Sequence, residues 1–233
     1  MDKLYMILLC LMIVPILICI KYSRKIKSDV ASSIVKCLIF TIVTILSNGL
    51  SAFSGNETFS YIMEALYRFS FDLMLIYVLQ YSQQYTRVFH EVSPFKKGCF
   101  IIAYLDGILL FLNIIFHNVF TIETVRFPNF DMYHVADKSI IFYFHYVFAY
   151  GLVFCIIASF IIKIIQIPDF YRKKYLPILV LMCVITVSKF ICGILEFPID
   201  VSLPFFVCAA ILICYLTLYR SPRELVDKTL SIV

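Results

Sequence analysis

Three charged residues recur at four-residue intervals within one long apolar stretch of the sequence. Glu64, Arg68 and Asp72 occupy positions i, i+4 and i+8 of the segment Phe59–Tyr81, so they share one face if this segment is helical. A helix rises 1.5 Å per residue, which places the two carboxylates about 6 Å on either side of Arg68. A lone charge at the centre of a membrane costs at least about 2.5–3.5 kcal/mol, so we expect this face to point into a helix bundle.

Two interpretations of this charged face are open. A buried ion-pair network would fix the packing of the helices, whereas a polar cavity or a switch would rearrange its pairs when a ligand binds. Ionisable residues inside a membrane are candidates for a functional site by default, so both interpretations are kept.

Two further charges inside apolar stretches also need partners. Lys189 is expected at the depth of Glu64 or Arg68, and we predict that it pairs with Glu64. Asp106 is expected nearer the depth of Asp72, where we predict that it meets a hydroxyl group or a water molecule.

Three polar residues at similar depths complete the set of candidate ligand-binding residues, namely Tyr61, Tyr67 and Asn48. The sequence contains no P-loop, HExxH or GxSxG motif, so we do not expect the chain to be an enzyme. Its nine cysteines all fall in apolar stretches without a CxxC pair. The four histidines are scattered, and we predict neither a metal site nor a cofactor; they are His90, His117, His134 and His145.

The elements that must position these side chains are membrane-spanning helices. The 233 residues are 62% apolar with a mean hydropathy of +0.95, far above the values of soluble domains. A membrane core needs roughly 20 apolar residues per helix. We predict an all-α bundle of seven transmembrane helices at Leu4–Ile20, Ala31–Phe53, Phe59–Tyr81, Gly98–His117, Ser139–Ile162, Tyr175–Phe197 and Val201–Tyr219.

The distribution of Lys and Arg predicts the orientation of the bundle. The connections 21–30, 82–97 and 163–174 and the tail 220–233 hold 14 of the 20 basic residues, whereas the alternate connections and the first three residues hold three. Positive residues gather on the cytoplasmic side, so we predict an external N-terminus and a C-terminus inside the cell. One basic residue precedes the first span and four follow it, which favours a retained helix over a cleaved signal peptide.

The longest external connection, 118–138, mixes aromatic, polar and charged residues. It is long enough to cover the mouth of the bundle. An ordinary connection and a lid that takes part in sensing are both compatible with it.

The tail after the last span predicts an amphipathic helix that leaves the membrane. Ser221 suits the N-cap, Pro222 the first helical position and Glu224 the third, which is a capping box. An apolar stripe follows and is still running at the last residue, as in a two-stranded connector. The predicted signal-output helix contains Arg220, Pro222, Glu224, Leu225 and Leu230.

Seven spans followed by the sequence LYRSPRELVDKTLSIV resemble the N-terminal seven-helix sensor region of bacterial histidine kinases and GGDEF-type diguanylate cyclases. The resemblance covers the whole chain and rests on topology, composition and the exit helix. It implies a sensor domain at 1–219 in the cell membrane and the start of a signalling helix at 220–233. It also implies an output domain, in cis or in trans, and a homodimer formed through the exit helix.

The function expected from this resemblance is relay of an external or membrane-borne signal to the cytoplasm. The lipid bilayer is the predicted partner, and nucleic acid is not, because the basic residues lie in short clusters between apolar stretches. A small transporter for a polar solute and a structural scaffold remain as alternatives. Charges inside spans fit all three classes, but only the sensor needs an exit helix.

Overall fold

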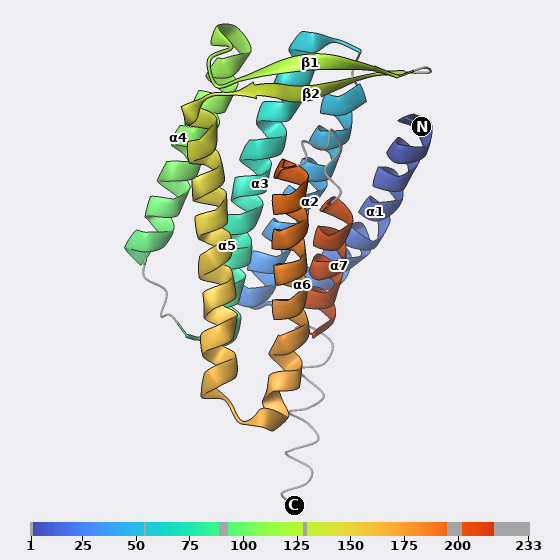
Figure 1. Cartoon of the computed structure of the whole chain (residues 1–233). Helices are drawn as coiled ribbons and strands as arrows, with labels where there is room; N and C mark the ends of the chain where they lie inside the picture. Colours follow the sequence, from blue (N-terminus) through green and yellow to red (C-terminus); the bar gives the residue numbers. More distant parts are fainter. Residues whose placement is uncertain (1, 54, 89–92, 128–129, 195–201, 217–233) are drawn as a thin grey trace, which may run out of the picture.

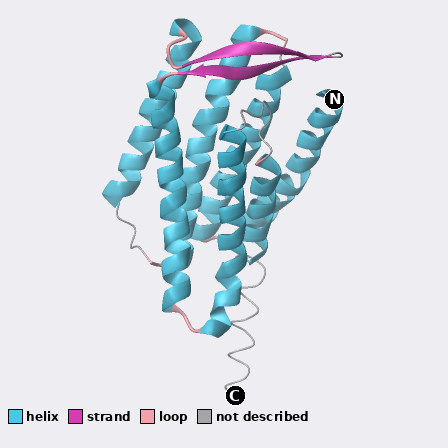
Figure 2. Ribbon diagram, viewed as in Figure 1, coloured by secondary structure: helices cyan, strands magenta, loops and turns pink. Residues whose placement is uncertain are grey.

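Seven helices and one β-hairpin make up the part of the chain that the computed structural model describes, which is residues 2–53, 55–88, 93–127, 130–194 and 202–216 (Figure 1). The described elements are α1 (Asp2–Ser23), α2 (Asp29–Phe53), α3 (Glu57–Thr86), α4 (Ser93–Phe116), β1 (Phe120–Phe127), β2 (Phe130–Lys138), α5 (Ile140–Gln166), α6 (Asp169–Ile194) and α7 (Leu203–Cys214). The helices pack side by side, and the hairpin lies across one end of the bundle (Figures 1 and 2).

Four helices have the length and apolar composition to cross a membrane. They contain the stretches Asp29–Ala52, Pro94–Phe116, Ile140–Gln166 and Tyr171–Cys192. The outer face of α4 shows the pattern most plainly, because Ile101, Leu105, Ile108 and Ile115 follow helical spacing and remain exposed. These features confirm a helical membrane protein, while the count of seven spans and the orientation stay predictions.

Several predicted boundaries differ from those observed. The helix α3 runs five residues beyond the predicted end at Tyr81, and the described part of α7 is only 12 residues long. The predicted signal-output helix with Arg220, Pro222, Glu224, Leu225 and Leu230 lies outside the described residues.

A seam of hydroxyl groups joins α2 to α3 along much of their length. Ser33 donates to Gln84 Oε1 at 2.9 Å near one end, and Thr44 lies 3.0 Å from the hydroxyl of Ser70 near the middle. At the other end the Ser60 hydroxyl donates to the carbonyl of Ser51 at 2.6 Å. Without water, small polar residues that bond across helices hold them in register, so this pair forms a rigid support for the charged face of α3.

The close approach of α4 to α3 depends on Gly107. A Cβ atom added there would lie 2.6 Å from Cδ2 and 2.9 Å from Cε2 of Phe69 on α3, distances that real Cβ atoms do not show. The neighbouring residue on α4 is Asp106, so this contact brings a carboxylate toward the centre of the bundle.

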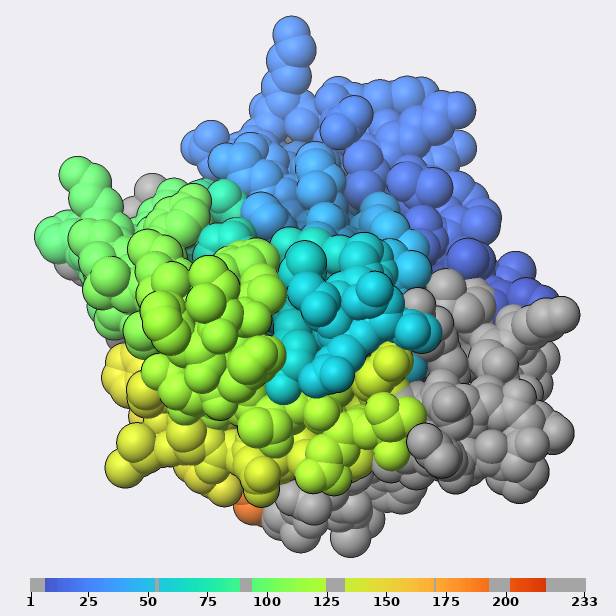
Figure 3. Space-filling view, turned by 90° about the horizontal axis from the view of Figure 1, so that it is seen from above, coloured from blue at the N-terminus to red at the C-terminus, as the bar shows by residue number. Residues whose placement is uncertain are grey.

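The connection predicted at 118–138 is a two-stranded antiparallel hairpin, which departs from the all-α expectation. Its register pairs Ile122 with Val135 and Phe127 with Phe130. Residues 120–127 (FTIETVRF) are rich in β-branched and aromatic residues, which favour a strand, a signal that we did not weigh for this connection. In the view from above, the hairpin lies between the ends of α3 and α5 (Figure 3).

The base of the hairpin is bonded to the bundle. The Asn113 side chain on α4 accepts from the backbone N–H of Val119 at 2.6 Å and donates to the carbonyl of Phe120 at 2.8 Å. The Tyr61 hydroxyl on α3 accepts from the N–H of Ile122 at 3.0 Å, and its ring stacks on Phe120 with centroids 5.7 Å apart. These contacts fix the hairpin directly above the charged residues of α3.

Candidate functional site

The charged face of α3 is divided into two separate groups. Glu64 and Arg68 form an ion pair at 2.5 Å with about 9% of each side chain exposed. The other Glu64 oxygen, Oε2, accepts from the Ser51 hydroxyl of α2 at 3.1 Å. Both carboxylate oxygens of Glu64 therefore have partners, as a buried carboxylate requires.

Aromatic rings surround the Arg68 guanidinium. Its central carbon lies 4.2 Å from the ring centroid of Phe142 on α5 and 5.8 Å from that of Phe120 on the hairpin. Cation–π contacts of this kind stabilise a buried cation. The Nε–H of Arg68 has no hydrogen-bond partner in the described part of the chain, so one donor remains available.

The expected contact of Lys189 with Glu64 is replaced by a contact with a tyrosine. Lys189 Nζ on α6 donates to the Tyr67 hydroxyl, and it lies 4.7 Å from the ring centroid of Phe71. Tyr67 is one residue before Arg68, so its side chain leaves α3 about 100° away from that of Arg68. This offset explains why Lys189 meets the phenol while Glu64 binds Arg68.

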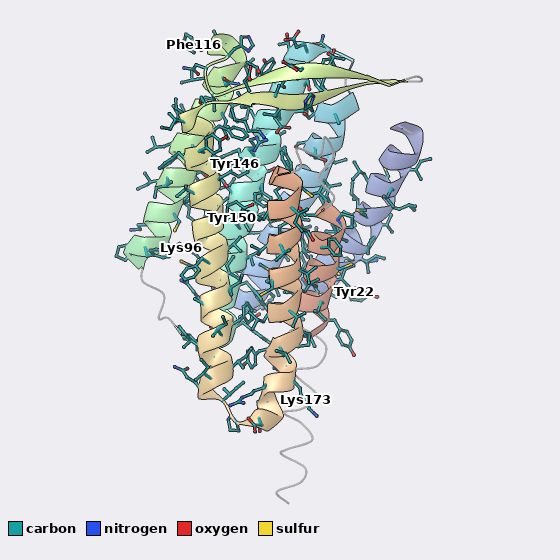
Figure 4. The ribbon with its side chains drawn as sticks, viewed as in Figure 1. Tyr22, Lys96, Phe116, Tyr146, Tyr150 and Lys173 are labelled. Atoms are coloured by element: carbon teal, nitrogen blue, oxygen red, sulfur yellow. The ribbon has the colours of Figure 1, made fainter. Side chains whose placement is uncertain are left out.

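A cavity lies between α3, α5, α6 and α7 beside these side chains. Its empty volume is about 540 Å³, its open mouth included. Arg68 and Lys189 give it two cationic side chains, and the described lining residues include no carboxylate. The rest of the lining is mainly aromatic and aliphatic, with Tyr146 and Tyr150 in the half of α5 that is nearer the hairpin (Figure 4). A cavity of this composition suits an amphipathic molecule with an anionic or hydrogen-bond-accepting head.

The helix α7 contributes directly to the cavity wall through Phe206. This ring is 7% exposed and packs edge-on against Phe71 of α3, with centroids 5.4 Å apart. Any change in the cavity that displaces Phe71 therefore reaches α7, because the two rings are in contact.

The second group of charges joins three helices at the centre of the bundle. Nδ1 of His145 on α5 lies 2.8 Å from Oδ2 of Asp106 on α4 and 3.3 Å from Oδ2 of Asp72 on α3. All three side chains are buried, and Asp72 is fully inaccessible. One oxygen of each carboxylate and one imidazole nitrogen lie within 4.8 Å of one another, which is a set that can hold a metal ion.

This cluster bears on three expectations. Asp106 was predicted to meet a hydroxyl group or water, but its described partner is His145. Asp72 was expected to pair with Arg68, yet its neighbours are His145 and Asp106. His145 was dismissed with the scattered histidines and no metal site was predicted, because sequence spacing alone could not show three helices converging.

Asp72 is the least satisfied polar group of the site. Neither of its carboxylate oxygens has a hydrogen-bond partner among the described residues. Nδ1 of His145 lies 3.3 Å from Asp72, but its hydrogen bond is with Asp106, so Asp72 has only an ion-pair contact with this nitrogen. A buried carboxylate without hydrogen bonds is costly, so its presence calls for an explanation such as a bound ion or a functional role.

The remaining predicted residues divide between the cavity and the scaffold. Tyr67 lines the cavity, whereas Tyr61 binds the hairpin. Asn48 is buried on α2, a helix that supplies none of the described lining residues.

Sequence reasoning singled out Tyr67, Arg68 and Lys189 among the described lining residues and missed the others, although a signal existed for three of those missed. His145 is an ionisable residue in an apolar span, which is reason enough to consider it. Tyr146 and Tyr150 are four residues apart and therefore share a helix face. Phe206 carries no such signal, because a phenylalanine in an apolar helix is as common on a lipid-facing surface as in a cavity.

Comparison with known proteins adds no family assignment. No model of a known protein family matches the chain, and no curated protein matches its sequence.

Proposed function

We propose that the chain is a membrane sensor that binds a small amphipathic molecule in its central cavity and relays the occupancy through α7. In this proposal the chain crosses the cell membrane seven times, with its N-terminus outside and its C-terminus in the cytoplasm. The hairpin then faces the exterior. A cytoplasmic output domain, in cis or in trans, receives the signal from the helix predicted at 220–233, and two copies pair through that helix.

The observation that carries the proposal is the place of Phe206. It is part of the cavity wall and belongs to the helix that leads toward the predicted exit segment. Ligand binding can shift an equilibrium only if the ligand contacts the two states differently. The Phe206 ring lines the cavity and packs against Phe71, so a bound molecule would contact it differently if α7 moved.

The ligand class follows from the lining of the cavity. Arg68 and Lys189 favour an anionic head, while the aromatic and aliphatic residues along α5, α6 and α7 favour an apolar body. Phe120 of the hairpin lies over Arg68, so a signal at the external surface has a short route to the same residue.

A reporter fusion tests the relay without knowledge of the ligand. Residues 1–233 are fused to a diguanylate cyclase output domain in a series of fusions, each with a linker one residue longer than the last. The series samples every rotation, or helical phase, of the output domain relative to the chain. Ala149→Phe fills the cavity, and Val147→Phe is its matched control, because Val147 is 70% exposed on the same helix.

The sensor proposal predicts that Ala149→Phe changes cyclase output at least threefold in one or more phases, while Val147→Phe does not. Equal output from both variants in every phase, with equal amounts of protein in the membrane, contradicts the proposal.

A small transporter is the second candidate, and the cluster of Asp72, Asp106 and His145 favours it. Titratable groups from three helices at the centre of a bundle are what a proton-coupled carrier uses. Reconstitution into vesicles that contain a pH-sensitive dye distinguishes the two classes. A carrier makes an imposed pH gradient decay faster, and the decay depends on these residues. With the proposed sensor, the gradient decays at the same rate as in vesicles without protein.

A further inference from the structure

We propose that Asp72, Asp106 and His145 form a binding site for one divalent transition-metal ion at the junction of α3, α4 and α5. The site shares His145 with the lining of the cavity but includes neither Arg68 nor Lys189, and the proposal does not depend on the sensor function. It rests on the donor set, the spacing of the donors, the charge of the cluster and the unsatisfied carboxylate of Asp72.

The donors and their spacing suit such an ion. Two carboxylate oxygens and one imidazole nitrogen are a mixed oxygen and nitrogen set, which ions from Mn²⁺ to Zn²⁺ accept. Metal–ligand bonds of about 2.1 Å at tetrahedral or octahedral angles separate adjacent donors by about 3.0–3.4 Å. The two distances from His145 Nδ1, 2.8 and 3.3 Å, require only small movements to reach this spacing.

The charge of the cluster also requires a positive partner. Asp72 and Asp106 bring two carboxylates into the buried centre of the bundle, and an imidazolium at His145 offsets only one of the two negative charges. Arg68, on the preceding turn of α3, is already bound to Glu64. A divalent ion neutralises both carboxylates, and it coordinates the Asp72 oxygens, which accept no hydrogen bond from the described residues.

Binding involves a defined exchange of protons. His145 must lose its Nδ1 proton before the nitrogen lone pair can coordinate the metal, while Nε2 keeps its hydrogen, so the imidazolium releases one proton for each ion bound. His145 also lines the cavity, so the cavity provides the route by which the ion enters and the proton leaves. The ion remains divalent throughout, and the step involves no change of oxidation state.

The experiment uses the full chain purified in detergent and stripped of metal with a chelator. Mn²⁺ serves as the probe, since the electron paramagnetic resonance signal of the free ion reports how much is bound. We expect one Mn²⁺ per chain, a thermal unfolding midpoint at least 5 °C higher in Mn²⁺ than in chelator, and spectral coupling of the bound ion to an imidazole nitrogen.

Asp72→Asn is the main variant, because it keeps the shape of the side chain and removes the charge. We expect it to weaken Mn²⁺ binding at least tenfold while its unfolding midpoint in chelator does not fall. Asp106→Asn provides the same test if Asp72→Asn yields no folded protein, and His145→Gln is expected to abolish the nitrogen coupling. Asp137→Asn on the exposed part of the hairpin is the control and should bind as the unaltered chain does.

Three results would overturn the proposal. They are the absence of saturable Mn²⁺ binding to the unaltered chain, unchanged affinity in Asp72→Asn and Asp106→Asn, and stabilisation by Na⁺ alone. None of these results bears on the reporter fusion, so the metal site and the sensor function can fail separately.

Discussion

The same face of α3 holds two groups of buried charge that are only two helical turns apart but differ in how well they are satisfied. At Glu64 one carboxylate oxygen binds Arg68 and the other accepts from Ser51. At Asp72 neither oxygen accepts a hydrogen bond from the described residues, although the side chain is the more deeply buried of the two. Glu64 and Asp72 therefore share one helix face but differ in how their carboxylates are bonded.

The difference is explained by the neighbouring helices. Glu64 faces α2, where a seam of serine and threonine hydroxyls supplies donors. Asp72 faces α4 and α5, where the nearest polar groups are a second carboxylate and one imidazole. Fully paired polar groups fix a structure, whereas local violations of that rule are expected at functional sites. We therefore expect Glu64 to act in the scaffold, where it holds Arg68 beside the cavity, and the Asp72 group to have a functional role.

The largest effect is expected from removal of one partner of the Glu64–Arg68 pair. Glu64→Leu leaves a buried guanidinium without its counter-ion, which should cost about 3–5 kcal/mol of unfolding free energy. The double variant Glu64→Leu, Arg68→Met removes both charges and should recover most of this loss. Unfolding in mixed detergent micelles with increasing denaturing detergent measures both. A loss below about 1 kcal/mol in the single variant would show that the pair does not serve the scaffold.

A smaller effect is expected where α4 approaches α3. Gly107→Ala places a methyl group against the Phe69 ring and should cost about 1–3 kcal/mol, because the ring or the helix must move. Gly151→Ala on α5 meets no atom within 4 Å, so it should be neutral or slightly stabilising. The same unfolding assay compares the two. Equal stability of both variants would mean that the helices are not held at the observed distance.

The smallest effect is expected at the hairpin. Tyr61→Phe removes the hydroxyl that accepts from the Ile122 N–H, a change of about 0.5–1.5 kcal/mol. Hydrogen exchange at the Ile122 amide should accelerate several-fold, while exchange within α3 stays unchanged. Tyr143→Phe is the control, because Tyr143 is 55% exposed on α5. Unaltered exchange at Ile122 would exclude Tyr61 as an anchor of the hairpin.

Much of the bundle was predictable from the sequence because apolar stretches of this length have few other solutions. The helices and the burial of Glu64, Arg68 and Asp72 follow from hydropathy and spacing. The hairpin at 118–138 was missed, since the β-branched and aromatic residues of this connection were not weighed as a strand signal.

The partners of the buried charges were not predictable, and the reason is geometric. Depth along a helix can be counted from the sequence, but the rotation of one helix against another cannot. Lys189 and Glu64 have similar depths, yet Lys189 contacts Tyr67. Asp106 and His145 are 39 positions apart on helices whose facing sides depend on packing at Gly107 and its neighbours.

The most direct test of the division between the two groups compares Glu64→Gln with Asp72→Asn by thermal unfolding in the same detergent and chelator. Each variant replaces one buried carboxylate of α3 by the amide of equal shape. We predict that Glu64→Gln lowers the unfolding midpoint, whereas Asp72→Asn leaves it unchanged or raises it. A midpoint lowered equally by both substitutions would show that Asp72 is part of the scaffold and contradict the account.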